Sequence, residues 1–540
     1  MAKSELAEAR SHMAEGRWPE AIRALTAAAG GEGPDSREAL LLLSQVFRRL
    51  GRPEQAVQAL EMILSRDPSD AEAKFQLANI ASEMGAGDGA ERLYRELLQA
   101  VPDSLPVRNN LANLLRGLHR PEEALQVMDA AMGQGRDSAD AMSTYGLCAM
   151  ECGDLDGARQ AFERALRLDP GHGQARANLG ELLLLTGEIA AGLAELEAAR
   201  RQLDSPAQVD VNLAYARFLE GEYRAGWEAF ESRFDAAAPT ERPPRPFTQR
   251  RWRGEKVAGA VLVWGEQGVG DEIVFASMIP DAMRRAERIV LECEPRLAPL
   301  FARSFPAVDV VPRSDPPAPR LQAPDIAAQI PLASLGGIFR NRREDFPADT
   351  AGTAAGAYLH ADPDLRRGLR ARYRQLGEGP LVGLSWRSVN ARAGPAKSMA
   401  LTDLSELLAV RPATFVNLQY GDVETEVADL RQRTGIRIIQ DSAVDQMRDM
   451  DAFAAQVAAL DLVITVSNTA AHVAGALGRP TWAMVPAGPG LRWYWGRSGV
   501  ACPWYGSLRL YRQPMPGRWH GLLAEMTAAF RDWQPPSVDD

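Results

Sequence analysis

The chain has 540 residues, enough for about three or four domains. Hydrophobic residues make up 46% and charged residues 24%, a composition that excludes a largely disordered chain. The net charge of −10 argues against general nucleic-acid binding. No apolar run approaches the roughly 18 residues of a membrane span, and no signal peptide is recognisable. We therefore expect a soluble, cytoplasmic protein.

Residues 1–235 carry a repeat with a period of 34 residues. Five residues after each repeated position stands a small residue, nine residues after it a large apolar one, and in three units a proline follows. The repeated positions are Gly51, Gly85, His119, Gly153, Gly187 and Gly221. The pattern resembles the tetratricopeptide repeat, which predicts stacked helix pairs in a superhelix. We expect its concave face to bind a protein or peptide; the alternative is that the repeats only scaffold or dimerise the chain.

Asparagines on the first helices of three units can hydrogen-bond an extended peptide, since one amide offers both donor and acceptor. The equally open alternative is that these asparagines are part of an ordinary polar surface. These residues are Asn109, Asn110, Asn113, Asn178 and Asn212. Prolines in residues 236–251 predict a linker that ends the repeats.

From residue 252 onward, short apolar runs alternate with helical stretches, which predicts parallel sheets covered by helices. The chain thus has the fold class of an α-solenoid followed by a two-lobed α/β module. We expect lobes at 252–360 and 361–515, facing each other across a cleft, and a C-terminal segment, 516–540, whose helix (Trp519–Trp533) folds back across both lobes. The predicted strands are Ala260–Trp264, Arg288–Cys293, Val308–Pro312, Leu381–Trp386, Thr414–Gln419, Ile436–Gln440, Leu462–Ser467 and Pro480–Val485.

The loop GEQGVGDE follows the first of these strands. It matches neither the dinucleotide fingerprint nor the Walker A loop. Its glycines, Gly268 and Gly270, precede Asp271, which stands where a helix begins. Asp271 is either a helix cap or a general base at the cleft, and Glu266 in the same loop is the alternative base.

The segment LVITVSNTAAHVAGALG predicts a strand followed by a helix that opens at Ser467, Asn468 and Thr469. Free amides at a helix start suit a phosphate. The helix dipole adds only about 0.3–1 kcal/mol, so side chains must contribute. The alternative to donor binding is that Lys397 is a solvated loop charge and His472 is a packing residue. The candidates are Arg387, Lys397, Ser398 and His472, with Trp493–Trp495 stacking on a base or sugar unless those rings are packed.

The motifs GVGD, GLSWRS, KSMAL, NLQYG, SNTAAHVAGALG and WYWGR together resemble GT-B glycosyltransferases, in particular the heptosyltransferase-like module fused behind tetratricopeptide repeats. The likeness covers about residues 225–535. Among proteins with this layout, the chain is most similar to flagellin-modifying glycosyltransferases of α-proteobacteria, which place a nonulosonic acid on serine or threonine. Ser467 stands where heptosyltransferases usually have aspartate, which argues against an ADP-heptose donor.

The resemblance implies a metal-independent transfer of a sugar from a nucleotide-sugar to Ser/Thr hydroxyls of a protein acceptor, with flagellin expected on the repeats. It implies no cofactor besides this co-substrate. Asp271, or alternatively Glu266, is then the catalytic base, and Gly268 and Gly270 form the acceptor loop. The implied donor-binding residues are Arg387, Lys397, Ser398, Gln419, Ser467, Asn468, Thr469 and His472. The alternative is a non-catalytic adaptor or chaperone that binds a protein partner.

Overall fold

The computed structural model describes residues 2–31, 33–130, 137–236, 245–347, 356–388 and 394–535. The chain divides into two compact units, Met1–Leu182 and Leu183–Asp540. In the described part of the chain, no helix is both long and apolar enough to cross a membrane.

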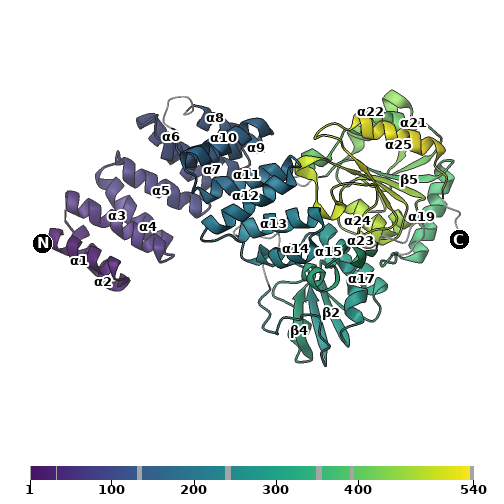
Figure 1. The fold of residues 1–540 in the computed structure, drawn as a ribbon, viewed down its shortest axis with the longest axis horizontal. Coiled ribbons are helices and arrows are strands. Elements are labelled where there is room, and N and C mark those ends of the chain that lie inside the picture. Colours follow the sequence, from purple (N-terminus) through teal and green to yellow (C-terminus); the bar gives the residue numbers. More distant parts are fainter. Residues whose placement is uncertain are drawn as a thin grey trace. The chain divides into compact units, whose positions relative to one another are not determined.

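The first half is built of helix pairs, each closed by a short turn (Figure 1). Each pair begins with an odd-numbered helix, and the pairs follow one another along the chain. The described helices are α1 (Ala2–Ala14), α2 (Trp18–Ala29), α3 (Pro34–Arg49), α4 (Pro53–Arg66), α5 (Ala71–Glu83), α6 (Gly87–Ala100), α7 (Leu105–Gly117), α8 (Pro121–Asp129), α9 (Ala139–Glu151), α10 (Leu155–Leu168), α11 (Gly173–Leu185), α12 (Ile189–Gln202), α13 (Ala207–Glu220) and α14 (Tyr223–Phe230).

The 34-residue period marks one backbone position, the turn inside each helix pair. At this position φ is positive in every unit, for example 69° at Gly51 and 84° at Gly153. Glycine adopts this left-handed conformation without the steric cost that a Cβ brings. His119 holds the same place with a φ of 59°, and it is the one non-glycine residue with positive φ in the part of the chain that the structure describes.

His119→Gly is therefore expected to stabilise the repeat unit, by about 1 kcal/mol. The side chain of His119 is exposed, so its removal costs no packing. Chemical denaturation of the full chain measures the change. The matched control is Gly85→Ala, at the same turn position with a φ of 78°, which is expected to lower stability. A loss of stability in His119→Gly would contradict this explanation of the period.

The small and large residues of the repeat have the packing roles that their spacing predicts. Each small residue is buried, as Ala56 and Ala158 are, with no exposed surface. In the last pair, a Cβ on Gly226 would come within 2.5 Å of the Phe218 ring. The large residues, such as Leu60 and Phe162, are buried as well. The prediction of a tetratricopeptide solenoid is confirmed.

Two of the five asparagines bond to a neighbouring repeat. Asn110 on α7 donates to Asn79 on α5 across 2.8 Å, and Asn178 on α11 donates to Ser143 on α9 across 3.1 Å. These two amides stabilise the stacking of helix pairs. Peptide binding by the asparagines stays a prediction.

The second half contains two parallel sheets (Figure 1). The first has the strand order β3-β2-β1-β4 and the second β10-β9-β8-β5-β6-β7, with every neighbouring pair parallel. This confirms the α/β prediction and adds two strands, β4 and β10, that were not predicted. The strands are β1 (Ala260–Trp264), β2 (Arg288–Cys293), β3 (Asp309–Pro312), β4 (Ile326–Pro331), β5 (Leu381–Ser385), β6 (Thr414–Asn417), β7 (Ile438–Ile439), β8 (Leu462–Val466), β9 (Thr481–Val485) and β10 (Leu508–Arg512).

Helices cover the sheets, and short 3-10 helices join several of the elements. The α-helices are α15 (Val269–Ala276), α16 (Ile279–Met283), α17 (Ala298–Ser304), α18 (Gly336–Phe339), α19 (Pro363–Leu376), α20 (Gly394–Lys397), α21 (Ser405–Ala409), α22 (Glu424–Thr434), α23 (Met450–Ala458), α24 (Thr469–Ala476) and α25 (His520–Asp532). The 3-10 helices used below are η1 (Glu231–Phe234), η7 (Leu401–Leu404), η8 (Gly488–Gly490) and η9 (Trp493–Trp495).

The C-terminal helix α25 packs on α21 and β10, within the second lobe. Its buried residues Leu522, Met526 and Phe530 join a core with Trp482 of β9. The prediction that this helix crosses both lobes was wrong, because its buried apolar residues pack with α21 and strands β9 and β10, all in the second lobe.

The helix pairs end with α14 and η1, close to the predicted end at residue 235. The boundary between compact units nevertheless falls earlier, at Leu182 and Leu183. Phe218 and Trp227 of the last pair share one hydrophobic core with Phe275 of the first lobe and Trp493 of the second. Of the predicted linker, residues 237–244 lie outside the described residues. The last repeat pair is thus part of the α/β unit.

Candidate functional site

Two short helices start at the ends of central strands and meet. Helix α15 follows β1, α24 follows β8, and the two helices are in contact. A Cβ placed on Gly270 would lie 3.1 Å from Cδ2 of His472. The carboxyl-end rims of the two sheets therefore face each other, as ligand-binding α/β folds require. The approach is close at this point, and it depends on Gly270 having no side chain.

The three acids of the loop GEQGVGDE have different surroundings. Glu266 is 1% exposed, and its carboxylate accepts a hydrogen bond from Arg233 of η1 across 2.8 Å. Glu272 is buried and accepts from the amide of Glu294 across 2.8 Å. Asp271 is partly exposed, and its charge acts on Lys397 in the second lobe. Of these three acids, Asp271 is therefore the one whose charge acts on a residue of the second lobe.

Lys397 ends α20 and is 7% exposed. Its ammonium donates to the backbone oxygen of Ser467 across 3.5 Å. Burial and, to a smaller extent, the Arg492 guanidinium lower the pKa of Lys397, and the Asp271 carboxylate opposes both; the resulting pKa is about 8. A cation held this way, at the start of α24, is suited to an anionic ligand.

His472 lies inside the protein, in the first turns of α24. Its ring stacks on Trp495 with a centroid distance of 4.8 Å, and Nδ1 is 2.9 Å from the hydroxyl of Tyr505. Burial lowers the pKa of His472 to about 3, and the nearby charge of Lys397 acts in the same direction. The imidazole is therefore neutral at pH 7 and adds no positive charge to the site.

The start of α24 offers fewer free amides than the sequence suggests. The amide of Asn468 donates to the Val466 oxygen across 2.7 Å, and the amide of Ala470 donates to the Asn468 side chain across 3.0 Å. The Thr469 amide is the one of these three to which the described residues give no acceptor. The hydroxyl of Ser467 is buried, and none of the residues that the structure describes forms a hydrogen bond with it. An anion here would meet one amide, one hydroxyl and the ammonium of Lys397.

Three other predicted donor-binding residues bond within the second lobe. Arg387 donates through Nε to Glu426 across 3.0 Å. The Gln419 side chain accepts from the Arg387 amide across 2.9 Å and is fully buried. Ser398 donates to the Gly394 oxygen across 2.7 Å. These bonds shape the loop after β5, and a direct role in binding the donor stays a prediction for all three.

The aromatic segment Trp493–Trp495 is buried. Trp493 stacks on Phe218 of α13 at a centroid distance of 4.1 Å, and Trp495 stacks on His472. The rings are therefore engaged in packing, which was the alternative to stacking on a base or sugar.

Two residues outside the predicted set act on the same site. Arg492 precedes the aromatic segment and lowers the pKa of Lys397. Tyr215 of α13 is partly buried, which raises its pKa, and the charges of Arg492 and Asp271 also act on it. Arg492 could have been identified from the sequence, because it directly precedes the aromatic motif. Nothing in the repeat pattern distinguishes Tyr215, because its role depends on the packing of α13 against the lobes.

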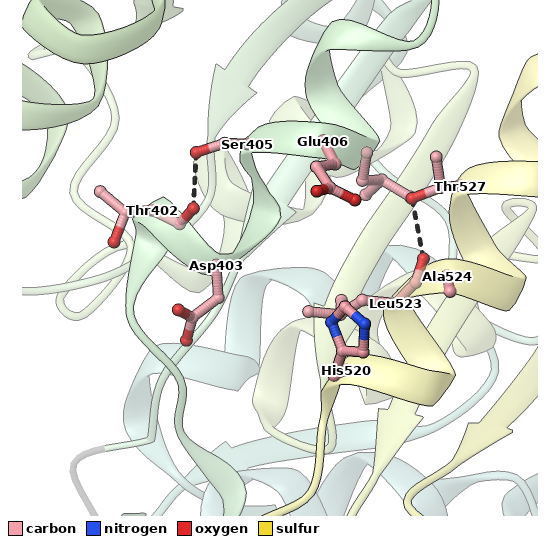
Figure 2. A pocket seen from close by; sticks show the side chains of 9 residues that line it. Thr402, Asp403, Ser405, Glu406, His520, Leu523, Ala524 and Thr527 are labelled. Atoms are coloured by element: carbon pink, nitrogen blue, oxygen red, sulfur yellow. Dashed lines mark hydrogen bonds between the residues drawn. The ribbon is translucent and has the colours of Figure 1, made fainter.

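A separate pocket of about 240 Å³ lies in the second lobe, lined by η7, α21 and α25 (Figure 2). Its polar residues include Asp403, Glu406 and His520, and Figure 2 shows the Thr527 hydroxyl bonded to the backbone of its own helix. None of the predicted site residues lines it.

Comparison with known families covers the helical half. A model described as tetratricopeptide repeat matches residues 6–71, 43–105 and 109–172, and a second model with the same description matches residues 149–214. A solved tetratricopeptide repeat protein from Parabacteroides merdae is similar to 44% of this chain and 94% of its own, with 18% sequence identity and a TM-score of 0.40.

Two curated relatives extend the comparison. Protein O-mannosyl-transferase TMTC1 of Homo sapiens is 25% identical over 187 residues, which are 34% of this chain and 21% of that protein. Protein FlbA of Caulobacter vibrioides is 33% identical over 510 residues, which are 91% of this chain and 84% of that protein. That similarity extends over both the repeats and the α/β lobes, so the chain belongs to the family of Protein FlbA.

Proposed function

We propose that this protein is a glycosyltransferase that moves a sugar from a nucleotide-sugar to serine or threonine hydroxyls of a protein acceptor. The acceptor proposed is flagellin, bound by the repeats, and the sugar is one such as a nonulosonic acid. The observation that carries the proposal is the contact of α15 with α24, which brings Asp271 on one rim near enough for its charge to act on buried Lys397 on the other. The name of TMTC1 adds support for joining such repeats to sugar transfer, although that likeness covers one third of this chain.

In this mechanism Asp271 takes the proton of the acceptor hydroxyl as general base. The hydroxyl oxygen attacks the anomeric carbon of the sugar, and the bond from that carbon to the nucleotide phosphate breaks. The phosphate leaves with added negative charge, which Lys397 and the Thr469 amide offset. Arg492 adds a second positive charge near Lys397. The proposed reaction is metal-independent, because these groups carry the charge compensation.

The close contact between Gly270 and His472 bears on how a donor enters. Lys397 and His472 are buried in this arrangement, and Asp271 is partly exposed. We expect a nucleotide-sugar to separate α15 from α24 when it binds beside Lys397. Binding of this kind would protect the donor from water during transfer.

Nucleotide affinity is expected to depend on the protonation of Lys397. Its pKa is about 8, so the ammonium is charged below this pH and loses its proton as the pH rises through it. Calorimetric titration with nucleoside diphosphates should therefore show weaker binding at pH 9 than at pH 7. Lys397→Ala should weaken binding at pH 7 about 10-fold or more, the loss expected for a charged hydrogen bond, and should remove the pH dependence.

Lys256 is the matched control, since its side chain is exposed and Lys256→Ala should leave affinity and pH dependence unchanged. Equal binding by wild type and Lys397→Ala would favour the non-catalytic adaptor over the enzyme. The acceptor is tested separately, by intact-mass analysis of flagellin from cells with and without the gene. An unchanged flagellin mass would remove flagellin as the acceptor.

A further inference from the structure

The connecting segment between β9 and β10, residues 487–499, is held by two consecutive residues at the end of β10. Arg512 donates hydrogen bonds to four backbone oxygens of the segment, through all three of its guanidinium nitrogens. The acceptors are the oxygens of Trp495 at 2.6 Å, Gly496 at 3.0 Å, Ser498 at 3.3 Å and Gly499 at 2.7 Å. At the other end of the segment, the Gln513 side chain accepts from the Ala487 amide across 3.1 Å.

The position of Arg512 follows from how the chain returns to the sheet. After the connecting segment, the chain runs antiparallel beside β10, where Ala501 and Arg509 form a bridge. The same register brings Arg512 opposite Ser498. An arginine suits this place, because its N–H groups point outward from a rigid plane toward several acceptors at once.

The connecting segment lies against Lys397 and His472. Its η8 turn is in contact with α20, and a Cβ placed on Gly490 would lie 3.1 Å from Cγ of Lys397. Further along, the ring of Trp495 stacks on His472 with a centroid distance of 4.8 Å. The segment therefore covers the stem of Lys397 and one face of the imidazole.

The charged groups that act on Lys397 come from this segment and from the facing rim. Arg492 belongs to the segment, and Asp271 belongs to α15. His472 on α24 is neutral at pH 7, because burial lowers its pKa to about 3. Moving the segment away would remove a neighbouring positive charge from Lys397 and admit water to its ammonium. Both changes raise the pKa of a lysine.

We infer that Arg512 and Gln513 are positioning residues, which hold the connecting segment over Lys397 and His472 and thereby keep the Lys397 ammonium in place at the start of α24. They act through the segment rather than by touching a ligand. That the anion bound by Lys397 is a nucleotide phosphate rests on the proposed function; the hold on Lys397 does not.

NMR of the full chain with carbon-13-labelled lysine tests the inference, because the Cε shift of a lysine follows the protonation of its ammonium. The chain has four lysines, and the spectrum of Lys397→Met assigns the signal of Lys397. In the wild type we expect a pKa of about 8 for Lys397. In Arg512→Met it should rise by about one unit or more, toward the value of about 10.4 for a solvated lysine.

Two further variants separate positioning from charge and from general loosening of the strand. Gln513→Leu changes no charge, and it should raise the pKa of Lys397 by a smaller amount because it releases the segment at one bond. Arg509→Met removes the same charge from the same strand. The Arg509 side chain is half-exposed and pairs with Glu525, so this control should leave the pKa of Lys397 unchanged.

A wild-type pKa in Arg512→Met, or an equal rise in Arg509→Met, would overturn the inference. A wild-type Lys397 that already titrates near the solvated value would overturn it too. If Arg512→Met does not fold, Gln513→Leu decides, and an unchanged pKa of Lys397 in that variant contradicts the inference. Failure of the wild type to bind nucleoside diphosphates, with the expected lysine shifts present, would count against the proposed function alone.

Discussion

Asp271→Asn is expected to lower the rate of sugar transfer about 10²- to 10⁴-fold, the usual contribution of a general base. The amide has nearly the shape of the carboxylate but cannot take the proton of the acceptor hydroxyl. Because Asp271 opposes the lowering of the pKa of Lys397, the substitution should also move that pKa further down. Steady-state transfer to the protein acceptor measures the first effect, and the pH dependence of nucleotide binding measures the second.

Nucleotide binding at pH 7 is the control for Asp271→Asn, and it should persist, at a somewhat reduced affinity, while transfer is lost. Such a result would locate the defect in the chemical step. Full transfer activity in Asp271→Asn would mean that the base lies elsewhere and would remove the central residue of the mechanism.

Glu266→Ala is expected to lower the stability of the unit Leu183–Asp540 by about 1–3 kcal/mol, because the buried Arg233 loses one of its two carboxylate partners, while Glu231 at 3.1 Å remains. The side chains of Arg233 and Glu266 are 4% and 1% exposed, and their ion pair joins η1 to the loop after β1. Denaturant-induced unfolding of the full chain, followed by tryptophan fluorescence, measures the loss.

Replacing both partners is the matched comparison. The double variant Arg233→Met, Glu266→Leu removes the charges together and should recover most of the stability lost by Glu266→Ala. If Glu266→Ala were as stable as the wild type but had no transfer activity, Glu266 rather than Asp271 would be assigned as the general base.

The repeats were readable from the sequence because each unit places the same residue types in the same backbone environment. A left-handed turn favours glycine, and a tight crossing of helices favours alanine. His119 shows the limit of that reasoning, since the turn is kept at 59° by the surrounding helix pair although the residue disfavours it.

The strands were predicted where apolar β-branched runs mark them and missed where they do not. Strand β4 (IAAQIP) is rich in alanine and follows a proline-rich segment, and β10 (LRLYR) alternates with arginine. Both lie at an edge of their sheet, where composition is less constrained than in a central strand.

The residue types of the candidate site were predicted from the sequence, whereas the orientations of their side chains could be seen only in the folded structure. Asp271 and Glu266 stand five residues apart. Only the structure shows that Glu266 is bonded to Arg233, whereas the charge of Asp271 acts on Lys397. Arg387 follows a strand as predicted, and Gln419, which was predicted to end its strand, lies beyond the end of β6; the bonds of both run within the lobe. Tyr215 belongs to the repeats by sequence and to the site by position.

The aromatic core shared by Phe218, Trp227, Phe275 and Trp493 has a consequence for how this architecture can be recombined. A cut at the proline-rich segment would remove α13 and α14 from the α/β lobes, and these helices supply Phe218 and Trp227 to the shared core. A cut upstream of α13 would keep these helices with the lobes. Grafting the lobes onto a new array, or lengthening the existing one, should therefore succeed when the last helices travel with the lobes and new repeats are added upstream of them.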